Sequence, residues 1–155
     1  MLKKVFIAVV VCLFVAVSVY AQEYPEVRGT PSQAKKLLEQ AVAFVKANGE
    51  EQAIKEFNDP WGRFVKGDLY VFAYDPKGVC LANPMFPDIV GKDLYNQPDT
   101  KGKLFRKEIV DLGNSKGSGL VDHMSKNPVT KKEELKVIYL QKVGNLVICC
   151  GAYMP

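Results

Sequence analysis

The stretch GDLYVFAYD at residues 67–75 decides the fold, because β-branched and aromatic residues dominate it. The sequence DPKG at 75–78 follows with the residues that a type I turn prefers, and a second short apolar run covers 79–83. We therefore predict a β-hairpin. Successive side chains of a strand point to opposite faces of the sheet. One face of the first strand would carry Tyr70, Phe72 and Tyr74, and the other Leu69, Val71 and Ala73.

Two helices are predicted before this hairpin. The sequence TPSQ at residues 30–33 is typical of a helix start, since Thr30 can cap the helix and Gln33 can complete a capping box. Apolar residues then recur at helical spacing until Asn48, which precedes a glycine. A shorter helix is predicted over about residues 50–57, where Asn-Asp-Pro ends it.

The chain after the hairpin predicts more strands and one further helix. Residues 84–102 contain three prolines, and loops of this length in compact domains usually serve a site or a lid. A helix over about 103–114 precedes strands predicted at 120–124, 135–143 and 146–153. This order predicts an α+β fold, with a central antiparallel sheet of about five to six strands and the long N-terminal helix packed on it.

The first 21 residues are predicted to be a secretion signal. Two lysines precede an unbroken apolar run, which ends in small residues, and cleavage is expected after Ala21. The run is shorter than the roughly 20 residues that span a bilayer, although retention as an anchor stays open. The sequence thus predicts a periplasmic or secreted protein with a polar tail at 22–29 and one domain at 30–155.

The charge of the chain does not favour nucleic acid as a partner. The formal net charge is +4, and removal of the two signal lysines lowers it by two to +2. The remaining lysines and arginines are spread along the chain without a basic block, so we expect no nucleic-acid partner.

No catalytic, metal or cofactor pattern is found in the sequence. One histidine and no Cys-x-x-Cys pair cannot build a usual zinc site, and no activated nucleophile or phosphate loop is visible. We therefore expect neither a cofactor nor enzymatic activity. Cys80 could pair with Cys149 or Cys150, but the adjacent pair is better explained as buried small apolar residues on opposite strand faces.

Several stretches, in order over about 110 residues, resemble the single Cache domain family (type 2). They are AVAFVKANG at 41–49, EFND at 56–59, GDLYVFAYD at 67–75, GVCLANP at 78–84, VGKD at 90–93, KGSGLVD at 116–122, NPVT at 127–130, KVIY at 136–139 and GAY at 151–153. The family consists of extracellular, PAS-like sensor modules of chemoreceptors, sensor kinases and stand-alone exported proteins.

The resemblance implies a helix on one face of the sheet and a small pocket on the other, roofed by the loop and third helix. Such pockets often hold small organic anions such as acetate, propionate or pyruvate. Because the sequence stops at Pro155, directly after the last strand, we expect a stand-alone member without its own output domain.

Lys136 and Tyr139 match the Lys-x-x-Tyr stretch of the family and are candidates for binding an anion. Positions three apart in a regular strand face opposite ways, so a shared pocket requires a bulge between them. The alternative is a solvated lysine beside a packed tyrosine. Arg106 on the third helix is a second candidate charge, with a plain surface position as its alternative.

Three further residues complete the predicted site. Tyr70 and Phe72, like Tyr74 on the same strand face, either line the pocket or belong to the ordinary core. Asn83 stands where many relatives have histidine, and its amide can still bind a carboxylate. His123 could add a pH-dependent charge, although a lone histidine on a strand is more often a surface or half-buried residue.

Two functions are therefore predicted from the sequence. The first is an extracytoplasmic domain that binds or senses a small organic acid. The alternative is a ligand-free interaction module that docks a membrane receptor or sensor kinase, or forms a homodimer. An exposed apolar patch on the first helix would favour the alternative.

Overall fold

The computed structural model of the protein describes residues 28–154. The predicted signal over 1–21, its cleavage site after Ala21, and most of the polar tail at 22–29 lie outside the described residues. Within residues 28–154, no helix has both the length and the apolar character needed to cross a bilayer.

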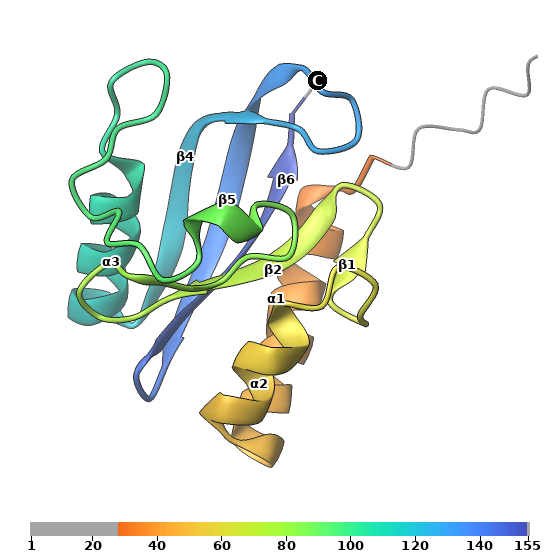
Figure 1. Ribbon diagram of the computed structural model, residues 1–155, viewed down its shortest axis with the longest axis vertical. Helices are drawn as coiled ribbons and strands as arrows, with labels where there is room; N and C mark the ends of the chain where they lie inside the picture. Colours follow the sequence, from red (N-terminus) through yellow and green to blue (C-terminus); the bar gives the residue numbers. More distant parts are fainter. Residues whose placement is uncertain (1–27, 155) are drawn as a thin grey trace, which may run out of the picture.

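Helices and a hairpin open the described chain, and a three-stranded meander closes it (Figure 1). The elements are α1 (Pro31–Asn48), α2 (Glu50–Phe57), β1 (Val65–Lys66), β2 (Leu69–Tyr74), β3 (Cys80–Ala82), the 3-10 helix η1 (Pro87–Ile89), α3 (Phe105–Lys116), β4 (Ser118–Lys126), β5 (Glu133–Val143) and β6 (Leu146–Tyr153). The predicted helices and strands are present. However, α3 begins two residues later than predicted, β4 and β5 are longer, and β1 was not predicted.

All strand pairs are antiparallel, and the sheet has the order β1-β2-β6-β5-β4, which confirms the predicted fold class. The sixth strand, β3, pairs with the far end of β2, at Ala73 and Tyr74, whereas β1 pairs with Leu69 and Tyr70. The two short strands thus share one edge of β2, and β6 occupies the other.

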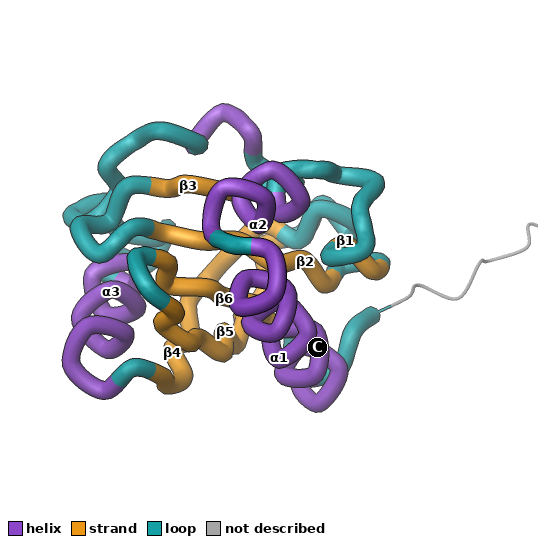
Figure 2. The backbone as a smooth tube through the Cα atoms, turned by 90° about the horizontal axis from the view of Figure 1, so that it is seen from below, coloured by secondary structure: helices purple, strands orange, loops and turns teal. Residues whose placement is uncertain are grey.

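Each face of the sheet has its own buried cluster, as the alternation along β2 predicted. Leu69, Val71 and Ala73 pack with the apolar side of α1, whereas Tyr70, Phe72 and Tyr74 pack with α3 and the loop before it. Figure 2 shows α1 and α3 on opposite sides of the strands. All six residues of β2 are buried, because both faces of this strand are covered.

The start of α1 is held by local and long-range hydrogen bonds. Gln33 N donates to Thr30 Oγ1 over 3.2 Å, and Thr30 N donates to Gln33 Oε1 over 2.8 Å, so the predicted capping box is present. Just before the cap, Gly29 N donates to the buried carboxylate of Asp68 over 2.6 Å. The other oxygen of Asp68 accepts from Asn127 Nδ2, which ties this segment to the loop after β4.

The loop at residues 84–104 and the helix α3 cover the second face and are called the roof below. Asp99 anchors this roof. Its Oδ1 accepts hydrogen bonds from the backbone N–H groups of Lys101 and Lys103, and its Oδ2 accepts from Met124 N on β4, each over 2.9 Å. Burial acts to raise the pKa of Asp99, but these three donors outweigh it and hold the pKa below its usual value. The carboxylate therefore fastens the loop to the sheet.

Replacing Thr30 by alanine removes the side-chain oxygen that satisfies Gln33 N. We expect the free energy of unfolding to fall by about 1 kcal/mol, the usual cost of losing such a cap. Urea unfolding followed by circular dichroism measures this difference, with Thr30→Ser, which retains a hydroxyl, as the control. If the free energy of unfolding fell equally in the Thr30→Ala and Thr30→Ser variants, the cap would not stabilise α1.

Candidate functional site

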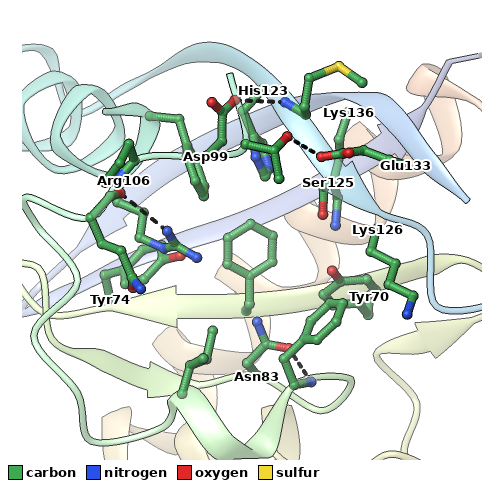
Figure 3. A pocket seen from close by; sticks show the side chains of 18 of the residues that line it. Tyr70, Tyr74, Asn83, Asp99, Arg106, His123, Ser125, Lys126, Glu133 and Lys136 are labelled. Carbon is green, nitrogen blue, oxygen red and sulfur yellow. Dashed lines mark hydrogen bonds between the residues drawn. The ribbon is translucent and has the colours of Figure 1, made fainter. Parts of the chain in front are cut away.

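A cavity of about 470 Å³ lies between β2, β4, β5 and the roof, on the face opposite α1. Its volume lies within the range of about 300–1,000 Å³ that is usual for small-molecule sites. Figure 3 shows side chains from all of these elements pointing toward a common space. The apolar part of the wall is mainly aromatic and consists of Tyr70, Phe72, Tyr74, Phe86, Ile89, Pro98, Phe105 and Met124.

Lys136 brings a buried positive charge to the cavity. Its side chain, from β5, is 1% exposed, and its Nζ lies 3.7 Å from the ring centre of Tyr70, 4.7 Å from that of Tyr153 and 5.1 Å from that of Phe72. Among residues 28–154, the ammonium has no hydrogen bond and no ion pair. Three aromatic rings therefore surround a cation that has no counter-charge in contact with it.

The path of the Lys136 side chain depends on Gly151 of β6. A Cβ atom at Gly151 would lie 2.8 Å from Lys136 Cε and 2.8 Å from Val137 O. Because real Cβ atoms do not approach other atoms this closely, a glycine is needed where the lysine crosses the neighbouring strand. Gly151 is therefore a positioning residue for the cavity charge.

Burial lowers the pKa of Lys136 from its usual value to about 7, while Cys150, Asp68 and Cys149 act in the opposite direction. The cavity thus holds an ammonium that readily loses its proton near neutral pH. An anion bound beside it would favour the charged form and raise the pKa.

A cluster of hydroxyl groups adjoins Lys136. Tyr153 Oη donates to Lys126 O over 3.2 Å, so it accepts from Tyr70 Oη at 3.3 Å and from Ser125 Oγ at 3.4 Å. Burial raises the pKa of both phenols, and both therefore keep their protons at neutral pH. The cluster can offer hydroxyl donors to a ligand by rotating its O–H bonds.

Arg106, in the first turn of α3, supplies a second positive charge. Its guanidinium carbon lies 4.3 Å from the ring centre of Phe105, and its Nη1 donates to Gln97 O over 3.4 Å. Its Nε is buried without a hydrogen-bond partner among the described residues. Arg106 also lies near Tyr74, since its charge opposes the increase that burial causes in the pKa of that phenol.

His123, on β4, lines the cavity between the two charges. Its ring stacks on Phe105 with 3.6 Å between ring centres, and its Nδ1 is buried and lacks a partner within the described part of the chain. Burial, followed by the charges of Lys136 and Arg106, lowers the pKa of His123 to about 3. The imidazole is therefore neutral, and the preferred sequence interpretation as a surface or half-buried residue was wrong.

Asn83 both shapes the roof and faces the cavity. Its Oδ1 accepts from Met85 N over 3.2 Å and from Phe86 N over 3.0 Å, which turns the chain after β3. Its amide nitrogen points into the cavity in Figure 3. The side chain thus has a structural role on one side and a free donor on the other.

The structure brings five of the six predicted site residues into one cavity, namely Tyr70, Phe72, Asn83, Arg106 and Lys136. Tyr139 is not among them. The pairing of β5 with β6 runs without a bulge from Lys136 to Val143, so Tyr139 faces the opposite side of the sheet from Lys136 and packs against the α1 cluster. The Lys-x-x-Tyr spacing is therefore that of a regular strand, and the two residues serve different faces.

Several residues in or beside the cavity were not among the predicted site residues. Tyr74 belongs to the alternating aromatic set of β2, which was a usable signal, and a glycine inside the last strand could have indicated a close approach at Gly151. Ser125, Tyr153 and Phe105 carry no local signal, because their roles arise from strand pairing and from the position of the roof.

The three cysteines of the described chain are free and buried. Cys149 and Cys150 lie in different clusters on opposite faces of the sheet, as predicted, and Cys80 is paired with neither. Burial raises the pKa of Cys80 to about 11 and that of Cys150 to about 12, so these thiols are not activated nucleophiles. Within residues 28–154, no group of three or more His, Cys, Asp or Glu side chains could hold a metal.

The family description "Single Cache domain 2" matches residues 16–155 of the chain. The chain belongs to this family. Cache domains are extracellular or periplasmic sensor and ligand-binding modules, which agrees with a fold that encloses a cavity under a roof. No curated protein matches the chain at a significant level.

Three solved structures share the Cache fold with this domain. A methyl-accepting chemotaxis protein from Vibrio parahaemolyticus RIMD 2210633 has a TM-score of 0.67 and 21% identity, over 79% of this chain and 86% of the other. The periplasmic sensor domain of a chemotaxis protein has a TM-score of 0.62 and 22% identity, over 80% of this chain and 90% of the other. A Cache chemosensory domain described for carboxylic acid recognition has a TM-score of 0.61 and 23% identity, over 80% of this chain and 88% of the other.

Replacing Lys136 by methionine should stabilise the ligand-free protein at low pH. Because the unfolded chain keeps the higher lysine pKa, it binds more protons than the folded chain between about pH 7 and 10.5, so the Lys136 contribution to stability rises with pH over that range. We expect the free energy of unfolding to rise by about 2 kcal/mol in the variant at pH 6, where the buried charge costs most, and we expect no gain at pH 9, where the folded wild type holds a neutral lysine.

Urea unfolding of the wild type and the Lys136→Met variant at both pH values measures this difference, and the comparison cancels the titration of the other groups. A gain of equal size at pH 6 and pH 9 would contradict a buried ammonium with a lowered pKa.

Proposed function

We propose that this domain senses a small carboxylic acid, which binds in the cavity with its carboxylate at Lys136. The observation that carries the proposal is the buried ammonium of Lys136, which faces a cavity and has no counter-charge in contact with it. A ligand carboxylate would supply that charge. Acetate, propionate and pyruvate are the simplest candidates, and a structural neighbour is described for carboxylic acid recognition.

The surroundings of Lys136 suit a carboxylate. Each charge-assisted hydrogen bond contributes about 1.5–3 kcal/mol, and the hydroxyls of Tyr70 and Ser125 can add donors to the ammonium. The Asn83 amide can donate from the opposite wall. The aromatic side chains exclude water, which strengthens these interactions.

The location and domain limits belong to the same proposal. A sensor of external acids requires export, for which a signal over residues 1–21 with cleavage after Ala21 is the proposed route. The working domain would then be residues 30–155. A membrane receptor or sensor kinase is the proposed recipient of the signal.

The interaction-module alternative has less support. It requires an exposed apolar patch on α1, but the outward positions of this helix are mainly polar. These exposed positions include Gln33, Lys35, Lys36, Glu39, Gln40, Lys46 and Asn48. A helix surface of this kind is compatible with solvent.

A thermal-shift screen of the purified protein against short mono- and dicarboxylates, with amines and sugars as negative classes, tests the function. A ligand at 100 times its Kd adds about 2.7 kcal/mol to the stability of the folded state. We expect stabilisation by acids, loss of it in Lys136→Gln, and no change in Lys46→Gln, which removes an exposed lysine of α1. Stabilisation that survives in Lys136→Gln would contradict the proposed position of the carboxylate.

The affinity for the acid should depend on pH. A carboxylate ligand stays ionised above about pH 6, whereas the Lys136 ammonium, with a pKa of about 7, falls from about nine-tenths protonated at pH 6 to one-tenth at pH 8. We expect calorimetry to find a Kd about tenfold higher at pH 8 than at pH 6. A constant Kd would mean that Lys136 does not bind the carboxylate.

A further inference from the structure

We infer that the ligand of this cavity is a dicarboxylate, with one carboxylate at Lys136 and the other at Arg106 and His123. This inference rests on the proposed function and specifies its ligand class. A short monocarboxylate at Lys136 would leave the Arg106 end of the cavity without an anion.

The unsatisfied polar atoms of the domain point to a second anionic group. Besides the Lys136 ammonium, two buried side-chain nitrogen atoms of the described chain lack a hydrogen-bond partner, Arg106 Nε and His123 Nδ1. Both residues line this cavity. Buried polar groups nearly always have a hydrogen-bond partner in folded proteins. Two unpaired nitrogen atoms in the wall of one cavity therefore indicate that a ligand supplies the acceptor. A carboxylate can accept from the guanidinium and from the imidazole, if the imidazole carries its proton on Nδ1.

The protein itself does not neutralise the two cations. The acidic residues in the cavity wall are Asp99 and Glu133. Asp99 is engaged by three backbone N–H groups, and Glu133 accepts from Thr100 Oγ1. No ion pair within residues 28–154 includes Arg106 or Lys136. Two further lysines of the wall, Lys126 and Lys131, are exposed to solvent, where a charge contributes less.

The two cations lie at opposite ends of an aromatic strip on β2. The ring centres of Tyr70 and Phe72 are 5.8 Å apart, and those of Phe72 and Tyr74 are 5.9 Å apart. Lys136 Nζ lies over the Tyr70 end, while Arg106 adjoins Tyr74. Figure 3 shows the two side chains reaching the cavity from different sides, with His123 behind the space between them.

This arrangement sets an approximate ligand length. Residues four apart in a strand are separated by about 13 Å. Each carboxylate lies about 3 Å from its cation, so an acid of roughly four to six carbons can reach both ends. Its methylene groups would lie against the aromatic rings, which offer an apolar surface between the two charged ends.

Matched acid pairs test this inference by calorimetry at pH 6. Succinate is compared with butyrate, and glutarate with pentanoate, so that each pair differs only in the second carboxylate. We expect the dicarboxylate of a pair to bind at least tenfold more tightly than the monocarboxylate. In Arg106→Gln the ratio of the monocarboxylate Kd to the dicarboxylate Kd should fall to threefold or less. In Lys136→Gln both acids should bind more weakly than to the wild type.

Lys107→Gln is the matched control, since it removes a positive charge from the next residue of α3, whose ammonium contacts Tyr95 and Asp111 outside the cavity wall. The ratio should stay at the wild-type value in this variant. Equal affinity for succinate and butyrate in the wild type would overturn the dicarboxylate inference and leave the proposed function intact. A ratio that survives Arg106→Gln would overturn the assignment to Arg106. Binding of neither acid at millimolar concentration would overturn the proposed function and the inference with it.

Discussion

The rest of the structure depends on the complete burial of β2, whose six residues have neighbours on both faces. The two faces are covered in different ways. The helix α1 packs small and branched side chains against Leu69, Val71 and Ala73, and this contact closes the first face. The second face carries three aromatic rings and is covered by a loop and the shorter helix α3. A loop held by Asp99 cannot fill the space between such large rings as a helix does, so a cavity remains.

Charges are distributed unequally around this cavity. The carboxylates of Asp68, Asp99 and Glu134 bind backbone and side-chain donors that fasten loops and the start of α1. The salt bridge to Arg28 contributes most to the lowering of the Glu134 pKa to about 2. The bases Lys136 and Arg106 instead line the cavity. Because the acids are engaged in these hydrogen bonds, the two bases give this side of the cavity an excess of positive charge.

Local patterns predicted much of the fold. The capping box of α1, the hairpin and the alternation of β2 each depend on neighbouring residues, so they were visible in the sequence. The cavity depends on pairing between distant strands, which sequence spacing does not encode. Gly151 matters because it lies beneath Lys136, and His123 is buried because Phe105 stacks on it. Tyr139 was predicted to share the cavity with Lys136, three residues away. Because β5 is a regular strand, Tyr139 faces the opposite side of the sheet.

The two-residue connection at Gly144 and Asn145 has a consequence for how this domain can evolve. This tight turn sets the register of β5 against β6, and the side chains of β5 alternate between the cavity side of the sheet and the α1 core. A single insertion or deletion there would shift the strand by one residue and move Lys136 into the apolar core. Substitutions at cavity-facing positions leave the α1 contacts unchanged. Ligand preference can therefore diverge by point mutation among descendants of this domain, while changes of strand length are eliminated.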